Sequence, residues 1–256
     1  MNNSTISYKI IEFEELDSTN TYLKALAAQA YPEGTVISAD RQTGGRGRMG
    51  RSFFSPAGTG LYFSVLLRPA GRFADAGSLT ALAAVAAAEA VEEFSGKPAG
   101  IKWVNDVQIS GRKVCGILTE GRLGTADPKD EYAVIGIGIN CFEPEGGFPP
   151  EIEKTASAVF SCRQDSSLRK ALRSRILSGI SSYYCSGDSS QYYDRYCARS
   201  CIIGREVDII RNGETIGHGA AAGIEKDFRL RIVLPDGSET LLDSGEVSVR
   251  SGLTAQ

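Results

Sequence analysis

Residues 44–51 of this chain form a segment that cannot be part of a packed hydrophobic core. The run reads Gly-Gly-Arg-Gly-Arg-Met-Gly-Arg, with four glycines and three arginines in eight positions. Glycine loses more backbone freedom on folding than any other residue, so ordering this run is costly. The segment predicts a surface loop that an anion organises, since guanidinium groups match phosphate and carboxylate oxygens in pairs. The alternative is an exposed loop without a ligand.

The arginines stand out against an acidic background. The chain has 256 residues and a net charge of −3, which favours a small anionic ligand over a polyanion and speaks against specific DNA binding. Its longest apolar run, residues 79–91, is interrupted by Thr80 and Glu89 and is too short to span a bilayer. With no signal peptide in view, the six scattered cysteines are expected to stay reduced, and we expect a cytoplasmic protein without membrane attachment.

Hydrophobic patterning predicts an α+β domain with a mixed β-sheet flanked by helices. A helix is expected after the capping candidates Asp17-Ser18-Thr19-Asn20, and a second, alanine-rich helix from a Ser78 cap to about residue 94. Two further helices are expected within residues 168–201, separated near 186–188. The expected strands are residues 8–13, 35–39, 61–67, 101–109 with an interruption, 113–120 and 132–140.

The pattern changes beyond residue 201 to short alternating strands. An Asn212-Gly213 pair and a Pro235-Asp236-Gly237 turn separate them, and Asn-Gly between such runs is a strong hairpin signal. The last of these strands is expected within residues 239–249. We therefore expect a large α+β domain over residues 1–202, big enough to hold an active site, and a small β-barrel over residues 203–256. No linker separates the two, so they are expected to pack together.

Two further segments suggest chemistry. Lys102-Trp103-Val104-Asn105-Asp106 places a lysine in an apolar run, where its charge is costly unless an anion compensates it. The strand Gly136-Ile137-Gly138-Ile139-Asn140 contains glycines, which often mark a close approach of a ligand to the backbone. The alternative for Lys102 is a surface lysine beside a turn. Neither segment is a phosphate-binding P-loop or a Rossmann fingerprint.

In this order the motifs resemble the biotin–protein ligase family. The resemblance covers residues 16–140 and rests on segments 16–20, 45–51, 53–56, 102–106 and 136–140. It implies a class II synthetase-like catalytic domain of the biotin–lipoate ligase type with a small C-terminal SH3-like β-barrel. It also implies an enzyme that forms a carbon–nitrogen bond: it joins biotin to AMP, using ATP and Mg²⁺, and passes biotin to a lysine of a carboxylase's biotin carboxyl carrier domain.

The resemblance also implies roles for individual residues. The implied biotin-binding residues are Ser18, Thr19, Gln42, Gly45, Arg46, Gly47, Arg48, Lys102, Gly116 and Gly136. The implied ATP or adenylate contacts are Arg46, Arg48, Arg51, Phe53, Asn105, Lys113 and Asn140. The implied catalytic residues are Lys102, Arg48, Lys113 and Asp106, with Asp106 serving the acceptor amine. The ligands of a metal ion are not identified, and a homodimer is left open.

The chain departs from the family pattern in two places. Val104 stands where proline is common, which should loosen the strand break that aims Asn105 and Asp106. Phe53 stands where tryptophan is common, so stacking on adenine should be weaker. Too few residues precede Ser18 for the winged helix-turn-helix domain of some members, so we expect the monofunctional type without a DNA-binding domain.

Two rival functions remain to be compared. Lipoate–protein ligases share the fold and the adenylation, but their usual histidine-bearing motif is missing, since the chain's single histidine is His218. A non-enzymatic nucleic-acid binder would use Arg46, Arg48 and Arg51 as phosphate contacts. The net acidity and the Lys102 motif count against that second reading.

Overall fold

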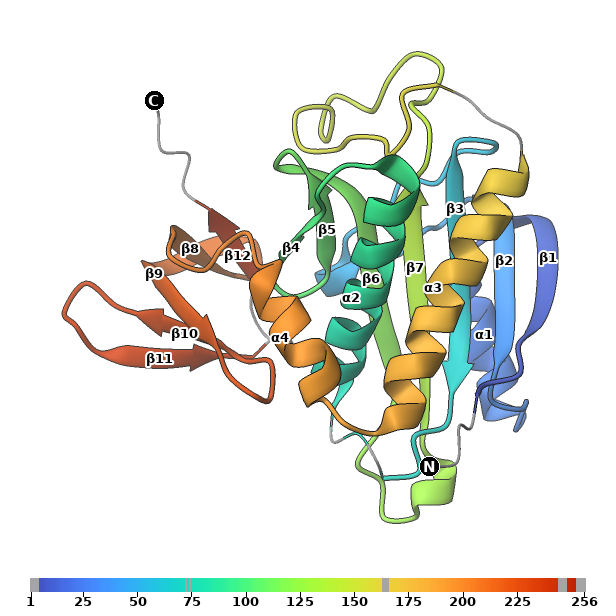
Figure 1. Ribbon diagram of the computed structural model, residues 1–256, viewed down its shortest axis with the longest axis horizontal. Coiled ribbons are helices and arrows are strands. Elements are labelled where there is room, and N and C mark those ends of the chain that lie inside the picture. Colours follow the sequence, from blue (N-terminus) through green and yellow to red (C-terminus); the bar gives the residue numbers. More distant parts are fainter. Residues whose placement is uncertain (1–4, 72, 74, 163–165, 244–247, 252–256) are drawn as a thin grey trace.

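The computed structural model describes residues 5–71, 73, 75–162, 166–243 and 248–251. Within them the larger part is a seven-stranded mixed sheet with helices on both faces, which confirms the predicted fold class (Figure 1). The strands are β1 Lys9–Leu16, β2 Thr35–Gln42, β3 Gly60–Leu67, β4 Gly100–Lys102, β5 Asp106–Ile109, β6 Arg112–Arg122 and β7 Tyr132–Asn140. Their order is β1-β2-β3-β7-β6-β5-β4; β1 is parallel to β2 and the other neighbours are antiparallel.

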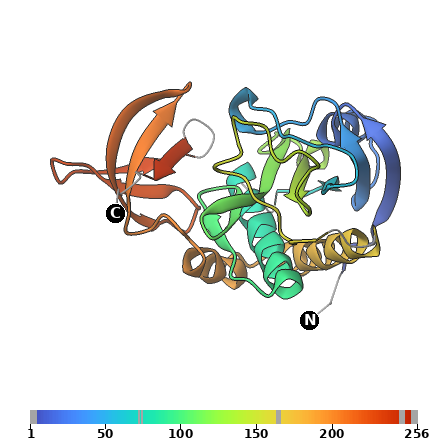
Figure 2. The same ribbon diagram turned by 90° about the horizontal axis from the view of Figure 1, so that it is seen from above.

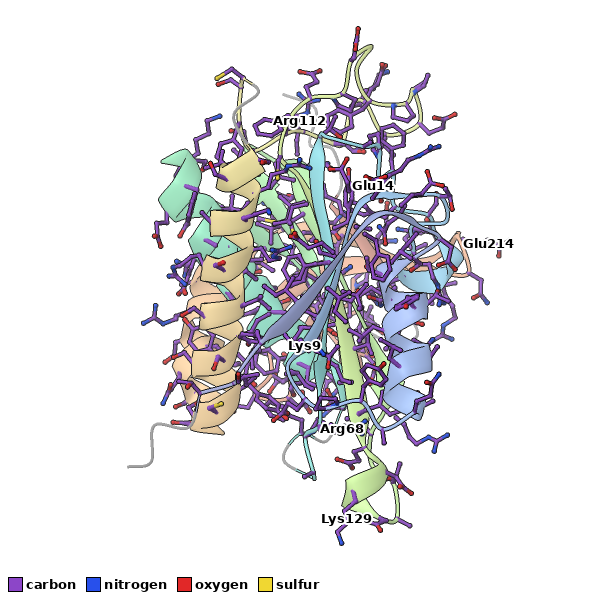
Figure 3. All side chains as sticks on the ribbon, turned by 90° about the vertical axis from the view of Figure 1, so that its right-hand side faces the viewer. Lys9, Glu14, Arg68, Arg112, Lys129 and Glu214 are labelled. Atoms are coloured by element: carbon purple, nitrogen blue, oxygen red, sulfur yellow. The ribbon has the colours of Figure 1, made fainter. Side chains whose placement is uncertain are left out.

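Four helices in the described residues flank the sheets. They are α1 Thr19–Ala28, α2 Ala76–Ser95, α3 Ser166–Ser186 and α4 Ser190–Ala198. α1 packs on β2, β3 and β7, whereas α2 and α3 pack against each other over the opposite face (Figure 2). Figure 3 shows α3 and α1 on the two sides of the strands, with side chains filling the space between. The predicted break between the last two helices is confirmed at Gly187, which has a positive φ.

Alternation along β7 decides which face carries the core. Ile135 and Ile137 belong to the large core that includes α2 and α3, while Val134 packs with Leu23 of α1 on the other face. Because side chains alternate along a strand, Gly136 and Gly138 share the face of Val134. At these two positions β7 therefore places no side chain on the α1 face of the sheet. The pocket described below opens at this part of the face.

The start of α2 differs from the prediction. Asp75, not Ser78, is its N-cap: the Asp75 carboxylate accepts a hydrogen bond from the backbone N–H of Ser78 at 3.0 Å. The predicted Ser78 cap was wrong because a better capping side chain stands three residues earlier and the helix already begins at Ala76. Gly96 ends the helix with φ 67°, the left-handed conformation typical of this position.

The C-terminal part is an antiparallel sheet. Its strands are β8 Glu206–Arg211, β9 Glu214–Ile224, β10 Leu230–Val233, β11 Glu239–Leu242 and β12 Ser248–Ser251, in the order β11-β10-β9-β8-β12. The predicted hairpin is confirmed, with positive φ at Asn212 and Gly213. The last strand predicted, residues 239–249, is instead two strands. In the described residues no pairing joins β11 to β12, so the sheet is not closed there, an arrangement consistent with the expected small SH3-like barrel.

The two parts of the chain share one core. Trp103 Nε1 donates to the carbonyl oxygen of Phe228 at 2.9 Å, and the Phe228 ring stacks on Tyr192 with centroids 5.4 Å apart. Tyr196 on α4 donates its hydroxyl to the Val104 carbonyl at 3.0 Å. The turn before β10 thus packs directly behind the segment that carries Lys102.

All six cysteines are free thiols, and Cys115 and Cys141 are buried. Burial raises the pKa of the Cys141 thiol to about 12, so this group behaves as an unreactive packing residue. None of the helices in the described part of the chain has the length and apolar character that crossing a membrane requires.

Candidate active site

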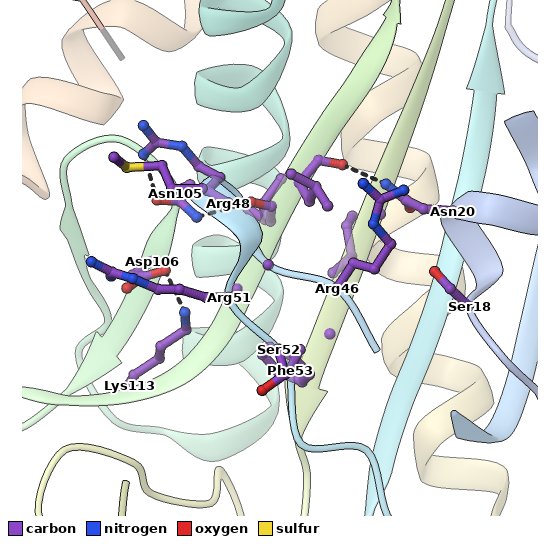
Figure 4. A pocket seen from close by; sticks show the side chains of 18 of the residues that line it. Ser18, Asn20, Arg46, Arg48, Arg51, Ser52, Phe53, Asn105, Asp106 and Lys113 are labelled. Atoms are coloured by element: carbon purple, nitrogen blue, oxygen red, sulfur yellow. Dashed lines mark hydrogen bonds and ion pairs between the residues drawn. The ribbon is translucent and has the colours of Figure 1, made fainter. Parts of the chain in front are cut away.

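A pocket opens on the α1 face of the main sheet, and it gathers segments that lie far apart in the sequence (Figure 4). They are the start of α1, the end of β2, the loop 44–51, the β4–β5 turn, and the glycine positions of β6 and β7. All the predicted site residues except Gly45 and Asn140 line it: Ser18, Thr19, Gln42, Arg46, Gly47, Arg48, Arg51, Phe53, Lys102, Asn105, Asp106, Lys113, Gly116 and Gly136. The residues of the predicted motifs therefore lie together around one pocket.

The start of α1 provides a network of uncharged polar groups. Ser18 caps the helix, and its hydroxyl accepts a hydrogen bond from the Thr21 backbone N–H at 3.4 Å. The backbone N–H and the hydroxyl of Thr19 both donate to Gln42 Oε1, at 2.9 and 3.1 Å. Gln42 Nε2 donates in turn to the Ser55 hydroxyl at 2.9 Å. These buried hydrogen bonds hold the side chains in fixed orientations, so this end of the pocket is preorganised.

Asn20 and Glu120 extend this network and were not predicted. Asn20 occupies the space that a side chain at position 136 would need, because a Cβ on Gly136 would overlap its amide oxygen. Its Nδ2 donates to Glu120 Oε2 at 3.0 Å, while Glu120 Oε1 pairs with Lys24 Nζ at 2.8 Å and Arg46 Nη2 at 3.2 Å. Burial alone would raise the pKa of Glu120, but the hydrogen bonds from Lys24 and Asn20 outweigh it and keep the pKa below the usual value.

The loop of residues 44–51, called the Gly/Arg loop from here on, is a compact turn over the pocket. Arg46 and Ser52 form an antiparallel bridge, and the backbone N–H of Gly47 donates to the Arg51 carbonyl at 2.7 Å. Gly50 has φ 74°, which L side chains rarely adopt, and this lets the chain reverse direction. The loop is exposed as predicted, yet cross-loop hydrogen bonds give it a defined shape.

Charged side chains gather at the opposite end of the pocket. Arg48 Nη1 donates to Asn105 Oδ1 at 3.1 Å, and burial lowers the pKa of its guanidinium, which stays protonated at neutral pH. Lys113 Nζ lies 2.7 Å from Asp106 Oδ1. Lys102 is paired across β4 and β5 with Asp106, so the strand register places both residues at this end. Fixed cations here are suited to an anion that carries charge on several oxygens.

Phe53 forms part of the pocket floor. A Cβ on Gly138 would lie 2.6 Å from Phe53 Cε1, and one on Gly116 would lie 3.1 Å from Phe53 Cε2. Glycines at both positions therefore let the ring lie flat against β6 and β7. Lys113 Nζ lies 5.7 Å from the ring centroid, within cation–π range.

Two predicted residues do not line the pocket. Gly45 is buried at the base of the loop, where its carbonyl accepts a hydrogen bond from the Phe53 N–H at 2.8 Å and a Cβ would collide with the Phe53 carbonyl. Asn140 donates its side-chain amide to the Ser157 carbonyl at 3.2 Å. Neither residue is part of the pocket lining.

Several lining residues were not predicted as site residues: Asn20, Met49, Ser52, Trp103, Ile117, Leu118, Ile137 and Gly138. Most of them stand inside the motifs or beside a predicted site residue, so adjacency was the available signal. The Gly-x-Gly spacing of β7, for example, places Gly138 on the same face as Gly136. Glu120 belongs to no motif, and its contacts with Asn20 and Arg46 come only from the fold.

The pocket has two chemically different ends. Figure 4 shows Ser18, Asn20 and Arg46 on one side and Arg51, Asp106 and Lys113 on the other, with Phe53 between them. The first end offers neutral hydrogen-bonding groups beside the glycine strands, and the second offers cations and one carboxylate. Such a pocket fits a ligand with a neutral polar ring system at one end and a reacting anion at the other.

The chain matches known families over both of its parts. Residues 12–140 match the biotin/lipoate A/B protein ligase family, and residues 202–250 match the biotin protein ligase C-terminal domain. A relative from Bacillus subtilis, named bifunctional ligase/repressor BirA, is 40% identical over 150 residues. That alignment covers 59% of this chain and 46% of the relative, so the chain spans about half the length of this protein.

Other similar proteins align over more of their length. The biotin–[acetyl-CoA-carboxylase] ligase of Mycobacterium tuberculosis is 30% identical over 237 residues, covering 90% of this chain and 85% of the relative. The structure also superposes on a biotin protein ligase from Aquifex aeolicus in complex with biotin and ATP, with a TM-score of 0.79 and 30% identity. That superposition covers 95% of this chain and 99% of the Aquifex chain.

Proposed function

Because the chain belongs to the biotin/lipoate A/B protein ligase family, we propose that it activates biotin with ATP to biotinyl-5′-AMP and transfers the biotinyl group to a lysine of a carboxylase carrier domain. The observation that supports this most is the two-ended pocket, in a chain that superposes on a ligase holding biotin and ATP. A neutral end suits the fused rings of biotin, and a cationic end suits its carboxylate beside a nucleotide phosphate.

At the neutral end we assign the biotin ring system to the start of α1. Ser18 and Thr19 would hydrogen-bond the ring heteroatoms, with Gln42 orienting Thr19 through its carbonyl oxygen. Gly116 and Gly136 would shape the biotin end by leaving room for Phe53 and Asn20, the side chains that pack on them. Gly45 and Gly47 would act through the shape of the loop.

At the charged end we assign the first half-reaction. A carboxylate oxygen of biotin attacks the α-phosphorus of ATP. A new bond forms between this oxygen and the α-phosphorus, and the bond from the α-phosphorus to pyrophosphate breaks. Negative charge spreads over the phosphoryl oxygens as this happens, so fixed cations lower the barrier. Arg48 and Lys102 would face the carboxylate and the α-phosphate, and Lys113 would meet the departing phosphates.

Magnesium is treated as a companion of the nucleotide. Among the described residues no group of three or more His, Cys, Asp or Glu side chains is arranged to hold a metal ion. Mg²⁺ commonly keeps several waters and binds through substrate phosphates plus one or two carboxylates. When bound, the ion would neutralise charge on the nucleotide phosphates; Asp106, the carboxylate that lines the pocket, is paired with Lys113 and is not assigned to it.

In the second half-reaction the acceptor lysine attacks the activated carbonyl carbon, and AMP leaves. A lysine amine is normally protonated, with a pKa of about 10.4, so it must lose a proton before it can attack. Asp106 would orient this amine and accept its proton. Arg51, Phe53 and Asn105 would hold the nucleotide during both steps, while Asn140 would act from behind the pocket.

The direct test is a transfer assay with mass spectrometry. The chain is incubated with ATP, Mg²⁺, a biotin carboxyl carrier domain and either biotin or lipoate. The expected result is a carrier that gains one biotinyl group with biotin, and none when its acceptor lysine is replaced by arginine. A carrier that stays unmodified with biotin, or a lipoyl carrier domain that becomes lipoylated instead, would contradict the proposal.

A further inference from the structure

The side chain of Arg46 points toward the end of the pocket at the start of α1, away from Arg51 and Lys113. Its Nη2 lies 3.2 Å from Glu120 Oε1, beside Asn20 (Figure 4). The Glu120 side chain is 17% exposed and the Arg46 side chain 45% exposed, so the carboxylate is the better fixed of the two. Arg46 thus has a carboxylate partner inside the protein before any substrate anion arrives, and it shares that partner with Lys24.

Glu120 is held in place by contacts that do not involve the loop. Lys24 Nζ lies 2.8 Å from its Oε1, and Asn20 Nδ2 donates to its Oε2 at 3.0 Å. The same Asn20 amide donates to the Leu118 carbonyl at 3.1 Å and accepts from the Ser64 hydroxyl at 2.6 Å. Glu120 therefore forms a rigid junction between β6 and α1.

Beyond its backbone hydrogen bonds, the Gly/Arg loop is held toward the charged end by Arg48, whose Nη1 donates to Asn105 Oδ1 at 3.1 Å. Its glycines leave the backbone free to open, and Arg46 precedes the reversal at Gly50. An ion pair between a rigid carboxylate and a flexible loop restricts the loop, because the carboxylate has little freedom left to lose. The Arg46–Glu120 pair thus ties the loop to the part of the pocket assigned to the biotin rings.

We propose that Glu120 is a positioning residue that, through Arg46, fastens the Gly/Arg loop over the biotin end of the pocket and so slows the release of biotin and its adenylate. This inference rests on the proposed function for the identity of the ligand. It assigns Arg46 to ligand retention, whereas Arg48 and Lys102 remain with the reacting anion. The contact between Glu120 and the loop itself can be tested without any ligand.

The ligand-free test is limited digestion with trypsin, which cuts after arginine in open loops. Glu120→Gln keeps the shape of the side chain and removes its charge, so cleavage after Arg46, Arg48 or Arg51 should become faster. Glu15→Gln is the matched control: it makes the same chemical change in the exposed ion pair with Arg41, outside the pocket, and its cleavage rate should stay near that of the unmodified chain. Unchanged cleavage in folded Glu120→Gln would overturn the proposal.

The ligand test measures release of preformed biotinyl-AMP. A partly exposed ion pair contributes up to about 1 kcal/mol, so Glu120→Gln and Arg46→Met should each release the adenylate about fivefold faster. The double variant should be no worse than either single variant, and in Glu120→Gln transfer from the bound adenylate should keep its rate. Additive losses, or a slower chemical step in Arg46→Met, would assign Arg46 to the reacting anion and overturn the proposal.

Thermal denaturation identifies a variant that fails to fold. If Glu120→Gln does not fold, Arg46→Met tests the proposal instead. Trypsin cleavage after Arg48 and Arg51 should also become faster in this variant, and an unchanged cleavage rate would refute the proposal. An unmodified chain that forms no biotinyl-AMP would refute the proposed function alone, since the digestion experiment still tests Glu120. The two failures are therefore distinguishable.

Discussion

Asp106→Asn should separate the two half-reactions. In the structure Lys113 Nζ lies 2.7 Å from Asp106 Oδ1, with side chains 33% and 24% exposed, so solvent weakens the pair. Such a pair contributes about 1 kcal/mol or less, equivalent to about fivefold in an equilibrium constant. Removing the carboxylate leaves Lys113 available to the phosphates of ATP, so ATP binding should tighten. The rate of adenylate formation at limiting ATP should stay within about fivefold of the original rate. Transfer should fall by about 10²–10⁴-fold, the usual contribution of a general base.

Single-turnover kinetics can measure each step alone. Pyrophosphate release reports adenylate formation, and carrier biotinylation from preformed biotinyl-AMP reports transfer. Glu15→Gln is the control, because it makes the same chemical change in an exposed ion pair with Arg41 outside the pocket. Equal losses in both steps, or unimpaired transfer, would refute the assignment of Asp106 and the idea that Lys113 exchanges partners.

Three further changes test the pocket. Lys102→Ala should slow pyrophosphate release by about 10²–10³-fold, the usual loss when one transition-state contact is removed, and release near the original rate would contradict its role. Gly136→Ala should weaken biotin binding in calorimetry and lower the melting temperature, because the added methyl overlaps Asn20 and overpacking costs about 1–3 kcal/mol; an unchanged melting temperature would contradict that packing. Phe53→Ala should weaken binding of a non-hydrolysable ATP analogue, by up to about 1.5 kcal/mol of stacking, with biotin binding unchanged as its internal control.

Local signals in the sequence predicted most of the fold. The alternating strand with two glycines became β7 with its predicted bounds, and Asn212-Gly213 became a hairpin turn with positive φ at both residues. The errors occurred where two local signals competed. Asp75 and Ser78 can both cap a helix, and which one does so depends on where the backbone enters the helix.

The candidate site was predictable to the extent that its residues stand in motifs. Lys102, Asn105 and Asp106 were recognised together because a strand break exposes consecutive side chains at one place. Glu120 could not be recognised, since its hydrogen bond with Asn20 joins residues separated by 100 positions. No local pattern carries such a contact; it exists only because β6 passes under the start of α1.

The three arginines of the loop show why residue type alone cannot assign a role. In the sequence Arg46, Arg48 and Arg51 are equivalent cations spaced along one flexible segment. In the structure Arg46 meets Glu120, Arg48 is largely buried against Asn105, and Arg51 is exposed at the rim. A guanidinium that is paired with a carboxylate contributes a weaker field to a substrate anion than the same group would contribute alone. Arg46 and Arg51 lie toward opposite ends of the pocket, on either side of the bridge from Arg46 to Ser52, and under the proposed function this division of partners would let one short loop serve both ligand retention and phosphoryl chemistry.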